Sequence, residues 1–412
     1  MGHRTNMADD LFDPAVFTSL LYEKMKRINP GVDDLALYEF GYGLNNVIPD
    51  AGWGAVELDS VEAIQTRIND RAFYDSIQIK PVQDKRIVLD EQILRLTRML
   101  MVGLVAGAYS EDWVRKHFYF DLRGFLFLHR TVYFTESVLA HFGGAPYRQF
   151  EQHQKRFERY QDVGYKDFMA ANAEVDQLFM DCVKTLIQAK GVPVLLAIAG
   201  PTAAGKTEIV ERLSEAFERM GRSVTSIELD NFLTDRDYRE AKGIFTQGKQ
   251  ALHFRLLVQA LEDICQGKPI SIPRYDFVFA TSSHDLDGNL KPDGVPIEIE
   301  PADIIFIEGN FPFLIEEVVH LIGIKVVYLT DDEVRMKRKW KRDIDYRKKY
   351  DPTYFRNRYF KDQFIMAEIA YRPQLEVCDI CVDTTGAALW TTPEVATMLH
   401  SGDSVKNHLA NR

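Results

Sequence analysis

The chain is poor in cysteine, with four in 412 residues. So small a number excludes a disulfide-stapled secreted scaffold and fits a reducing cytoplasm. Cys378 and Cys381 form a Cys-x-x-Cys pair, but Cys182 and Cys265 are far apart in sequence, so a structural zinc site would lack its second pair. Residues 377–382 resemble a strand rather than the helix start that a redox pair favours, which indicates two core cysteines.

Long hydrophobic runs and surplus positive charge are missing as well. The longest apolar run, residues 99–108, is too short to span a bilayer and predicts a buried helix, and the polar residues 1–10 predict no secretory signal. Asp and Glu outnumber Lys and Arg by 61 to 50, and the formal net charge of −11 argues against a general affinity for nucleic acid or anionic membranes. We therefore expect a cytoplasmic protein that does not bind membranes, and we regard nucleic acid as the least favoured of its candidate partners.

What the sequence does contain is a phosphate-binding loop. Residues 200–207 match the template Gly-x-x-x-x-Gly-Lys-Thr at every fixed position. The apolar residues 194–199 before the loop predict a buried parallel strand, and Ile209, Leu213 and Phe217 after it recur at helical spacing. A glycine turn that arose by chance would need neither the strand before it nor the helix after it. We therefore expect the N–H groups of the loop and the N-terminus of the helix to face phosphate oxygens. The expected nucleotide-binding residues are Gly200, Pro201, Thr202, Ala203, Ala204, Gly205, Lys206 and Thr207.

Four side chains have expected roles in phosphoryl transfer. Lys206 would reach the β- and γ-phosphates of ATP, and the Thr207 hydroxyl would bind Mg²⁺. Asp230 follows the predicted strand 223–229, where it could accept a proton from an attacking hydroxyl; the alternative is a turn or helix-capping aspartate. Glu308 follows the apolar residues 304–307, where it could hold Mg²⁺ through water or polarise the site; the alternative, a surface glutamate, rarely comes directly after four apolar residues.

A basic segment follows the predicted strand 324–328. Residues 335–361 carry twelve Lys and Arg against three Asp in a chain that is acidic overall. A solvated helical face and a nucleic-acid surface are both open interpretations. Its place upstream of the last predicted strand favours a third, a lid that closes over ATP and stabilises charge on the transferring phosphoryl group.

The first half of the chain carries no chemistry that we can name. Helices are predicted from Asp13-Pro14 onward, over residues 90–108 and over 165–189, whereas residues 118–142 could form strand or helix. Residues 147–160 fit a base-stacking surface or, preferably, an amphipathic helix. We expect a mostly helical domain at 1–188, a kinase domain at 189–395 and a tail at 396–412. The first domain has two open roles, to cover the acceptor site or to make a subunit contact in a homo-oligomer.

Five motifs in order resemble the uridine kinase and phosphoribulokinase family. They are the phosphate loop, Leu229-Asp-Asn-Phe-Leu233, Ile272-Pro-Arg-Tyr-Asp-Phe-Val278, Ile307-Glu-Gly309 and the basic run 335–343, within residues 192–390. The resemblance implies an α/β fold, a P-loop nucleoside-kinase-type sheet of five parallel strands flanked by helices. It also implies that Asp230 is the catalytic base, that Glu308 lies near Mg²⁺, that Tyr275 contacts the acceptor, and that Arg338 and Arg342 act from the lid.

The chain differs from uridine kinases in the motifs that bind the acceptor. Uridine kinases continue Tyr-Asp-Phe-Val with a histidine that contacts the base, where this chain has residues 279–282, Phe-Ala-Thr-Ser; His284 is out of register. An Asp-Ala-Phe-Asp element that binds ribose is replaced by residues 250–253, Gln-Ala-Leu-His. A site that loses such polar partners discriminates strongly against its former substrate.

We therefore predict an ATP- and Mg²⁺-dependent kinase that phosphorylates a hydroxyl of a small molecule other than uridine. Asp230, Lys206, Arg338 and Arg342 are the expected catalytic residues. Two alternatives remain at this point. One is a nucleotide-binding regulatory protein whose N-terminal domain binds a partner, and the other is a polynucleotide kinase. Pantothenate kinase, which shares an Asp-Asn-Phe-Leu element, widens the range of acceptors.

Overall fold

The computed structural model describes residues 11–70, 72–73, 90–121, 125–150, 173–244, 248–332, 334–335, 338–339, 342 and 366–400. They form two compact units. The first consists chiefly of the described part of Met1–Val132, and the second of the described parts of Tyr133–Gln154, Lys166–Lys349 and Glu368–Arg412. This division differs from the expected boundary at residue 188, because residues before 188 group with the sheet of the second unit.

The first unit is mostly helical. Its elements are α2 (Pro14–Ile28), η1 (Pro30–Asp34), α3 (Leu37–Leu44), η2 (Trp53–Ala55), α4 (Val61–Asn69), α6 (Glu91–Ala106), α7 (Glu111–His117), β1 (Phe118–Asp121) and β2 (Leu126–His129). Aspartates begin two of the helices as expected: the Asp13 carboxylate accepts hydrogen bonds at the start of α2, and that of Asp90 at the start of α6. Residues 99–105 of α6 are all buried, which confirms the predicted buried helix. In the described part of the chain no helix is long and apolar enough to cross a bilayer.

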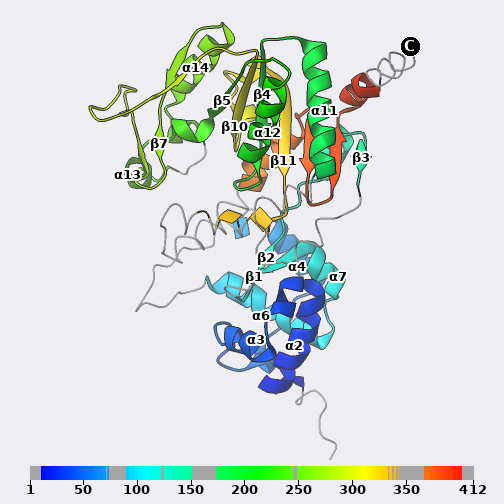
Figure 1. Cartoon of the computed structure of the whole chain (residues 1–412). Helices are drawn as coiled ribbons and strands as arrows, with labels where there is room; N and C mark the ends of the chain where they lie inside the picture. Colours follow the sequence, from blue (N-terminus) through cyan, green and yellow to red (C-terminus); the bar gives the residue numbers. More distant parts are fainter. Residues whose placement is uncertain are drawn as a thin grey trace, which may run out of the picture. The chain divides into compact units, whose positions relative to one another are not determined.

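The second unit is built on a parallel sheet (Figure 1). Its described strands are β3 (Arg148–Gln149), β4 (Val194–Ala199), β5 (Val224–Glu228), β10 (Ile304–Gly309), β11 (Ile322–Leu329), β12 (Ile380–Asp383) and β13 (Ala388–Thr391). Their order is β3-β13-β12-β11-β4-β10-β5. The five strands from β12 to β5 run parallel, as expected. Beyond β12, β13 pairs antiparallel with β12, and β3 pairs antiparallel with β13.

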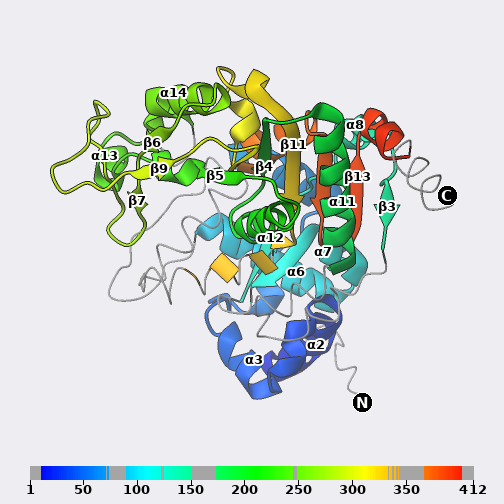
Figure 2. The same ribbon diagram turned by 45° about the horizontal axis from the view of Figure 1, so that its top comes forward.

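One face of this sheet is covered by two long helices. Helix α11 (Ala173–Lys190) and helix α12 (Lys206–Glu218) lie side by side on it (Figure 2). Their apolar side chains, such as Phe179 and Leu213, form one buried cluster with Leu196, Ile198 and Val326 of the strands. Because β4 is buried on both faces, all six of its residues are apolar.

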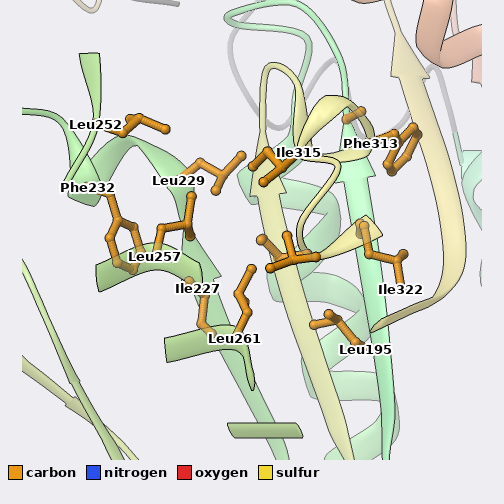
Figure 3. Close-up of a cluster of buried hydrophobic side chains, with 14 of the residues drawn as sticks. Leu195, Ile227, Leu229, Phe232, Leu252, Leu257, Leu261, Phe313, Ile315 and Ile322 are labelled. Atoms are coloured by element: carbon orange, nitrogen blue, oxygen red, sulfur yellow. The ribbon is translucent and has the colours of Figure 1, made fainter. Parts of the chain in front are cut away.

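The other face packs against the lobe that follows β5. This lobe contains η3 (Leu229–Phe232), α13 (Arg236–Ala241), η4 (Lys249–Ala251), α14 (Phe254–Cys265), β6 (Ile270–Ile272), β7 (Tyr275–Asp276), β8 (Thr281–Ser282) and β9 (Ile297–Ile299). Leu257 and Leu261 of α14 point toward Ile227 and Leu229 (Figure 3). This packing fixes the end of β5, where Asp230 begins to turn away from the sheet.

The remaining elements complete the second unit. They are α8 (Glu136–His141), η5 (Pro312–Leu314), η6 (Val319–Leu321), the π-helix η7 (Ala367–Tyr371) and α17 (Arg372–Leu375). Cys378 and Cys381 are fully buried before and within β12, as expected for core cysteines. Residues 236–250 are polar and contain glycine, a composition that predicts a loop. That prediction is wrong at α13, whose buried Arg239 holds the helix in place. Residues 151–172, most of the predicted amphipathic helix at 147–160, lie outside the described residues.

Candidate active site

The phosphate loop joins β4 to α12 through backbone conformations that require small residues. Gly200 has a φ of +153° and Gly205 a φ of +105°. A Cβ atom on Gly200 would lie 2.2 Å from the carbonyl oxygen of Tyr328 in β11, far inside van der Waals contact. Only glycine fits there, so the loop can turn tightly at the carboxyl end of β4 and present its amides to a phosphate.

Lys206 curls back over this loop from the first turn of α12. Its Nζ donates hydrogen bonds to the carbonyl oxygens of Gly200 at 3.0 Å and Pro201 at 3.1 Å. Burial lowers the pKa of Lys206, while the carboxylates of Glu308 and Asp230 oppose this shift. The ammonium is thus partly desolvated beside two acidic groups, the setting in which a cation attracts phosphate oxygens strongly.

Glu308 and Thr207 form the polar centre of the site. The Thr207 hydroxyl donates a 2.8 Å hydrogen bond to Glu308 Oε1 at the end of β10. Glu308 is 6% exposed, and burial raises its pKa to about 7 against the opposing charge of Lys206. Its second oxygen, Oε2, is buried without a hydrogen-bond partner among the described residues. A buried carboxylate oxygen with no partner fits a hard cation, which would take both Oε2 and the Thr207 hydroxyl as ligands.

Asp230 lies in η3, two residues beyond the end of β5, and its side chain is exposed. Burial raises the pKa of both Glu228 and Glu308, and the charge of Asp230 raises each pKa further. The same charge favours the charged form of Lys206, so these four groups share one electrostatic environment. Strands β4, β5 and β10 are neighbours and parallel, which brings their carboxyl ends to the same edge of the sheet. Asp230 therefore lies on the phosphate-loop side of the sheet and is accessible to a second substrate.

Two arginines of the basic segment lie against the phosphate loop. Arg338 Nη1 is 3.5 Å from the carbonyl oxygen of Ala203, and Arg342 Nη2 donates a 3.2 Å hydrogen bond to the hydroxyl of Thr202. Both guanidinium groups therefore lie within reach of a phosphate held by the loop. Most of the predicted lid at 335–361 lies outside the described residues.

Sequence reasoning missed how the basic segment is anchored. Arg335 is fully buried, and its guanidinium donates hydrogen bonds of 2.9 and 2.6 Å to Asp332. Tyr133 donates a further hydrogen bond of 3.2 Å to the same carboxylate. A run of like charges predicts a solvated surface, so nothing local indicated that its first arginine is a core residue.

Tyr275 in β7 is almost entirely buried. Its hydroxyl accepts a 2.7 Å hydrogen bond from Arg239 of α13, and its backbone N–H donates to the side-chain oxygen of Asn231 at 3.3 Å. Asn231 follows Asp230 directly, so β7 is tied to the segment that carries the expected base. The geometry shows Tyr275 supporting this segment, and an acceptor contact by Tyr275 stays a prediction.

Part of this chain is similar in sequence to known proteins. A model described as the phosphoribulokinase / uridine kinase family matches residues 195–384. The uridine kinase of Brevibacillus brevis is 34% identical over 160 residues, which cover 38% of this chain and 69% of the relative. The chain belongs to the phosphoribulokinase / uridine kinase family. Uridine-cytidine kinase 2-B of Danio rerio is another relative, 31% identical over 165 residues that cover 38% of this chain and 59% of the relative.

Solved structures of kinases are also similar to part of this chain. A putative fructose transport system kinase from a Silicibacter species overlaps 48% of this chain and 94% of its own, with a TM-score of 0.36 and 15% identity. D-glycerate 3-kinase from Cryptococcus neoformans overlaps 52% of this chain and 98% of its own, with a TM-score of 0.35 and 11% identity. Because these scores are low, the assignment to a P-loop kinase family rests on the sequence relatives. The α/β fold and the kinase class expected from the sequence are confirmed.

The lobe that follows β5 contains a buried polar network. His253, which stands in the segment that replaces Asp-Ala-Phe-Asp, is buried with its Nε2 3.0 Å from the hydroxyl of Ser282. The Ser282 N–H donates to Asp235 at 2.7 Å, and Lys291 forms a 2.8 Å ion pair with the same carboxylate. Burial, with the charge of His284, lowers the pKa of His253 to about 4, so the ring is neutral near pH 7. These groups satisfy one another within the protein.

Proposed function

We propose that this kinase uses ATP and Mg²⁺ to phosphorylate a hydroxyl group of a small molecule other than uridine. The observation that carries the proposal is the grouping of Lys206, Thr207, Glu308 and Asp230 at one edge of the sheet, with two arginines on the loop. A structural role for the loop alone would not need a buried carboxylate with an unpartnered oxygen beside it.

Residues of the loop would bind the triphosphate. The N–H groups at the start of α12 face the carboxyl edge of the sheet, where the helix dipole favours negative charge. Lys206 would exchange its two carbonyl partners for oxygens of the β- and γ-phosphates, which form stronger, charge-assisted hydrogen bonds. Arg338 and Arg342 would stabilise the negative charge that develops on the transferring group, a contribution of several orders of magnitude in other phosphoryl-transfer enzymes.

Thr207 and Glu308 would hold Mg²⁺. Held by these two side chains, Mg²⁺ would supply positive charge against the phosphate oxygens of the nucleotide. The hydroxyl and the carboxylate are both oxygen ligands, which Mg²⁺ prefers, and a site of one carboxylate, one hydroxyl and substrate phosphates is usual for this ion. Because Glu308 binds a proton more tightly than an ordinary glutamate, it would release that proton when it ligates the ion.

Asp230 would act as the general base. Its carboxylate accepts the proton of the acceptor hydroxyl as the hydroxyl oxygen forms a bond to the γ-phosphorus. The bond between that phosphorus and the bridging oxygen breaks, and the electron pair leaves with ADP. A positioned base of this kind contributes roughly 10²- to 10⁴-fold in rate.

The acceptor is expected to differ from uridine because the lobe beside Asp230 lacks the polar residues with which uridine kinases bind the base and the ribose.

A screen that couples ADP release to a spectroscopic signal would test nucleosides, pentose phosphates, polyols and pantothenate-like acids. We expect turnover with at least one of them, reduced at least 100-fold by Asp230→Asn. Asp237→Asn, an exposed aspartate on α13, is the matched control and should retain full activity.

Two outcomes would overturn the proposal. Undiminished turnover in Asp230→Asn would remove Asp230 from the mechanism. Tight ATP binding without turnover of any acceptor would favour the nucleotide-binding regulatory protein.

A further inference from the structure

Helix α11 lies before the segment that the family model matches, yet one of its carboxylates is buried beneath the phosphate loop. Asp176 is 2% exposed and accepts a 2.9 Å hydrogen bond from the hydroxyl of Tyr328 in β11. Its other oxygen forms an ion pair with Arg212 of α12. Asp176 therefore connects the strand beside β4 to the helix that begins with Lys206.

Tyr328 is the link between this carboxylate and the loop. Its carbonyl oxygen lies 2.2 Å from the position that a Cβ atom on Gly200 would take, and its ring carbon Cε1 lies 3.5 Å from the Cβ position of Gly205. Arg338 Nη1 is 3.7 Å from that same position. The Tyr328 ring and the Arg338 guanidinium thus flank the second glycine of the loop.

Both partners of Asp176 need it for physical reasons. A fully buried tyrosine hydroxyl without an acceptor is costly, so its ring would shift to find one. Arg212 lies six residues after Lys206 on α12, and its side chain is 20% exposed. Without Asp176 it would swing toward water, and α12 would lose its only described ion pair to α11.

We propose that Asp176 is a positioning residue for nucleotide binding: through Tyr328 and Arg212 it fixes the phosphate loop and the first turns of α12. This inference rests on the proposed function for its meaning in catalysis, but its primary readout is nucleotide affinity. A purely structural role, in which Asp176 only attaches α11 to the sheet, would lower stability and leave the affinity of the folded protein unchanged.

The test measures MgATP binding by calorimetry on the full chain, together with thermal unfolding. Tyr328→Phe removes only the hydroxyl, and Asp176→Asn keeps an oxygen acceptor for Tyr328 while leaving Arg212 without a counter-charge. We expect the Kd for MgATP to rise at least 10-fold in Asp176→Asn and at least 3-fold in Tyr328→Phe. Arg212→Lys preserves the opposite charge and should stay within 3-fold of the wild type. Asp181→Asn, an exposed aspartate on the same helix, should not change the Kd.

The outcomes separate this inference from the proposed function. If Tyr328→Phe and Asp176→Asn are folded and bind MgATP as tightly as Asp181→Asn, the inference is wrong, whatever acceptor the enzyme uses. If Asp176→Asn does not fold, Tyr328→Phe decides alone. Where an acceptor has been found, the Michaelis constant for ATP should rise in the same variants while that for the acceptor stays within 2-fold. An equal rise in both constants would contradict a role confined to the nucleotide.

Discussion

Replacement of Glu308 by glutamine should make the metal-free protein more stable at high pH. Burial raises the pKa of Glu308 from its usual value of 4.5 to about 7. Because the folded state binds this proton more tightly than the unfolded chain, the stabilisation is fully present below pH 4.5 and is lost as the pH rises to 7. At 1.36 kcal/mol per pH unit between those values, the ionised form destabilises the fold by about 3 kcal/mol. Glutamine carries no charge and keeps an oxygen for the Thr207 hydroxyl.

Urea denaturation in the presence of a chelator provides the assay. The free energy of unfolding is measured at pH 5 and pH 8 for the wild type, for Glu308→Gln and for Glu298→Gln, an exposed carboxyl on β9 that serves as control. We expect Glu308→Gln to exceed the wild type by less than about 1 kcal/mol at pH 5 and by up to about 3 kcal/mol at pH 8. The difference between the two proteins cancels the other titrating groups that they share.

The same proteins then test the role of Glu308 in metal binding. Addition of Mg²⁺ with ATP at pH 8 should stabilise the wild type by more than it stabilises Glu308→Gln, because the amide is a weaker ligand. If the unfolding free energies of Glu308→Gln and the wild type differed by the same amount at pH 5 and pH 8, burial would not raise the pKa of Glu308. Equal stabilisation by MgATP in both proteins would refute its role as a ligand.

Three further substitutions, one with a matched control, test the phosphate loop and the lobe that follows β5. Gly200→Ala should abolish ATP binding in a titration, because its Cβ meets a backbone oxygen; Gly221→Ala, also at positive φ but in open space, should cost about 1 kcal/mol in a thermal melt and spare binding. Burial lowers the pKa of His253 to about 4, so the neutral ring stabilises the fold fully above pH 6.5, and this stabilisation is lost as the pH falls to 4. His253→Gln should therefore remove up to about 3 kcal/mol of the pH dependence of the unfolding free energy over this range, measured by urea denaturation. Tyr275→Phe deletes the acceptor of the 2.7 Å bond from Arg239 and should cost about 1–3 kcal/mol in urea denaturation; an unchanged midpoint would contradict the bond.

The sequence predicted those parts of the kinase unit that local signals specify. The strand, glycine loop and helix at 194–218 carry a continuous apolar run, a fixed motif and helical spacing within 25 residues or so, and all three were found in place. Asp13 and Asp90 were readable as helix starts because capping is a contact between near neighbours. Glu308 stood out because a charged residue rarely follows four apolar ones without a role.

The parts that sequence reasoning missed depend on contacts between distant residues. Asp176 and Tyr328 are 152 residues apart, and neither has a local pattern that indicates a partner. Helix α13 has only six residues and no apolar periodicity, since its buried side chain is Arg239, so it was predicted as a loop. The antiparallel strand β3 pairs two residues with a strand more than 230 positions later, which no window of sequence could indicate.

The position of α11 also limits how the polypeptide can be divided for experiments. A fragment beginning at residue 189, at the boundary expected from the sequence, would keep every side chain proposed to be catalytic but would remove one helix from the sheet. Leu196, Ile198 and Val326 would then lose the cover of Phe179 and its neighbours. Such a fragment should aggregate on expression, whereas one that begins ahead of Tyr133 retains α8 and α11 and should remain dispersed.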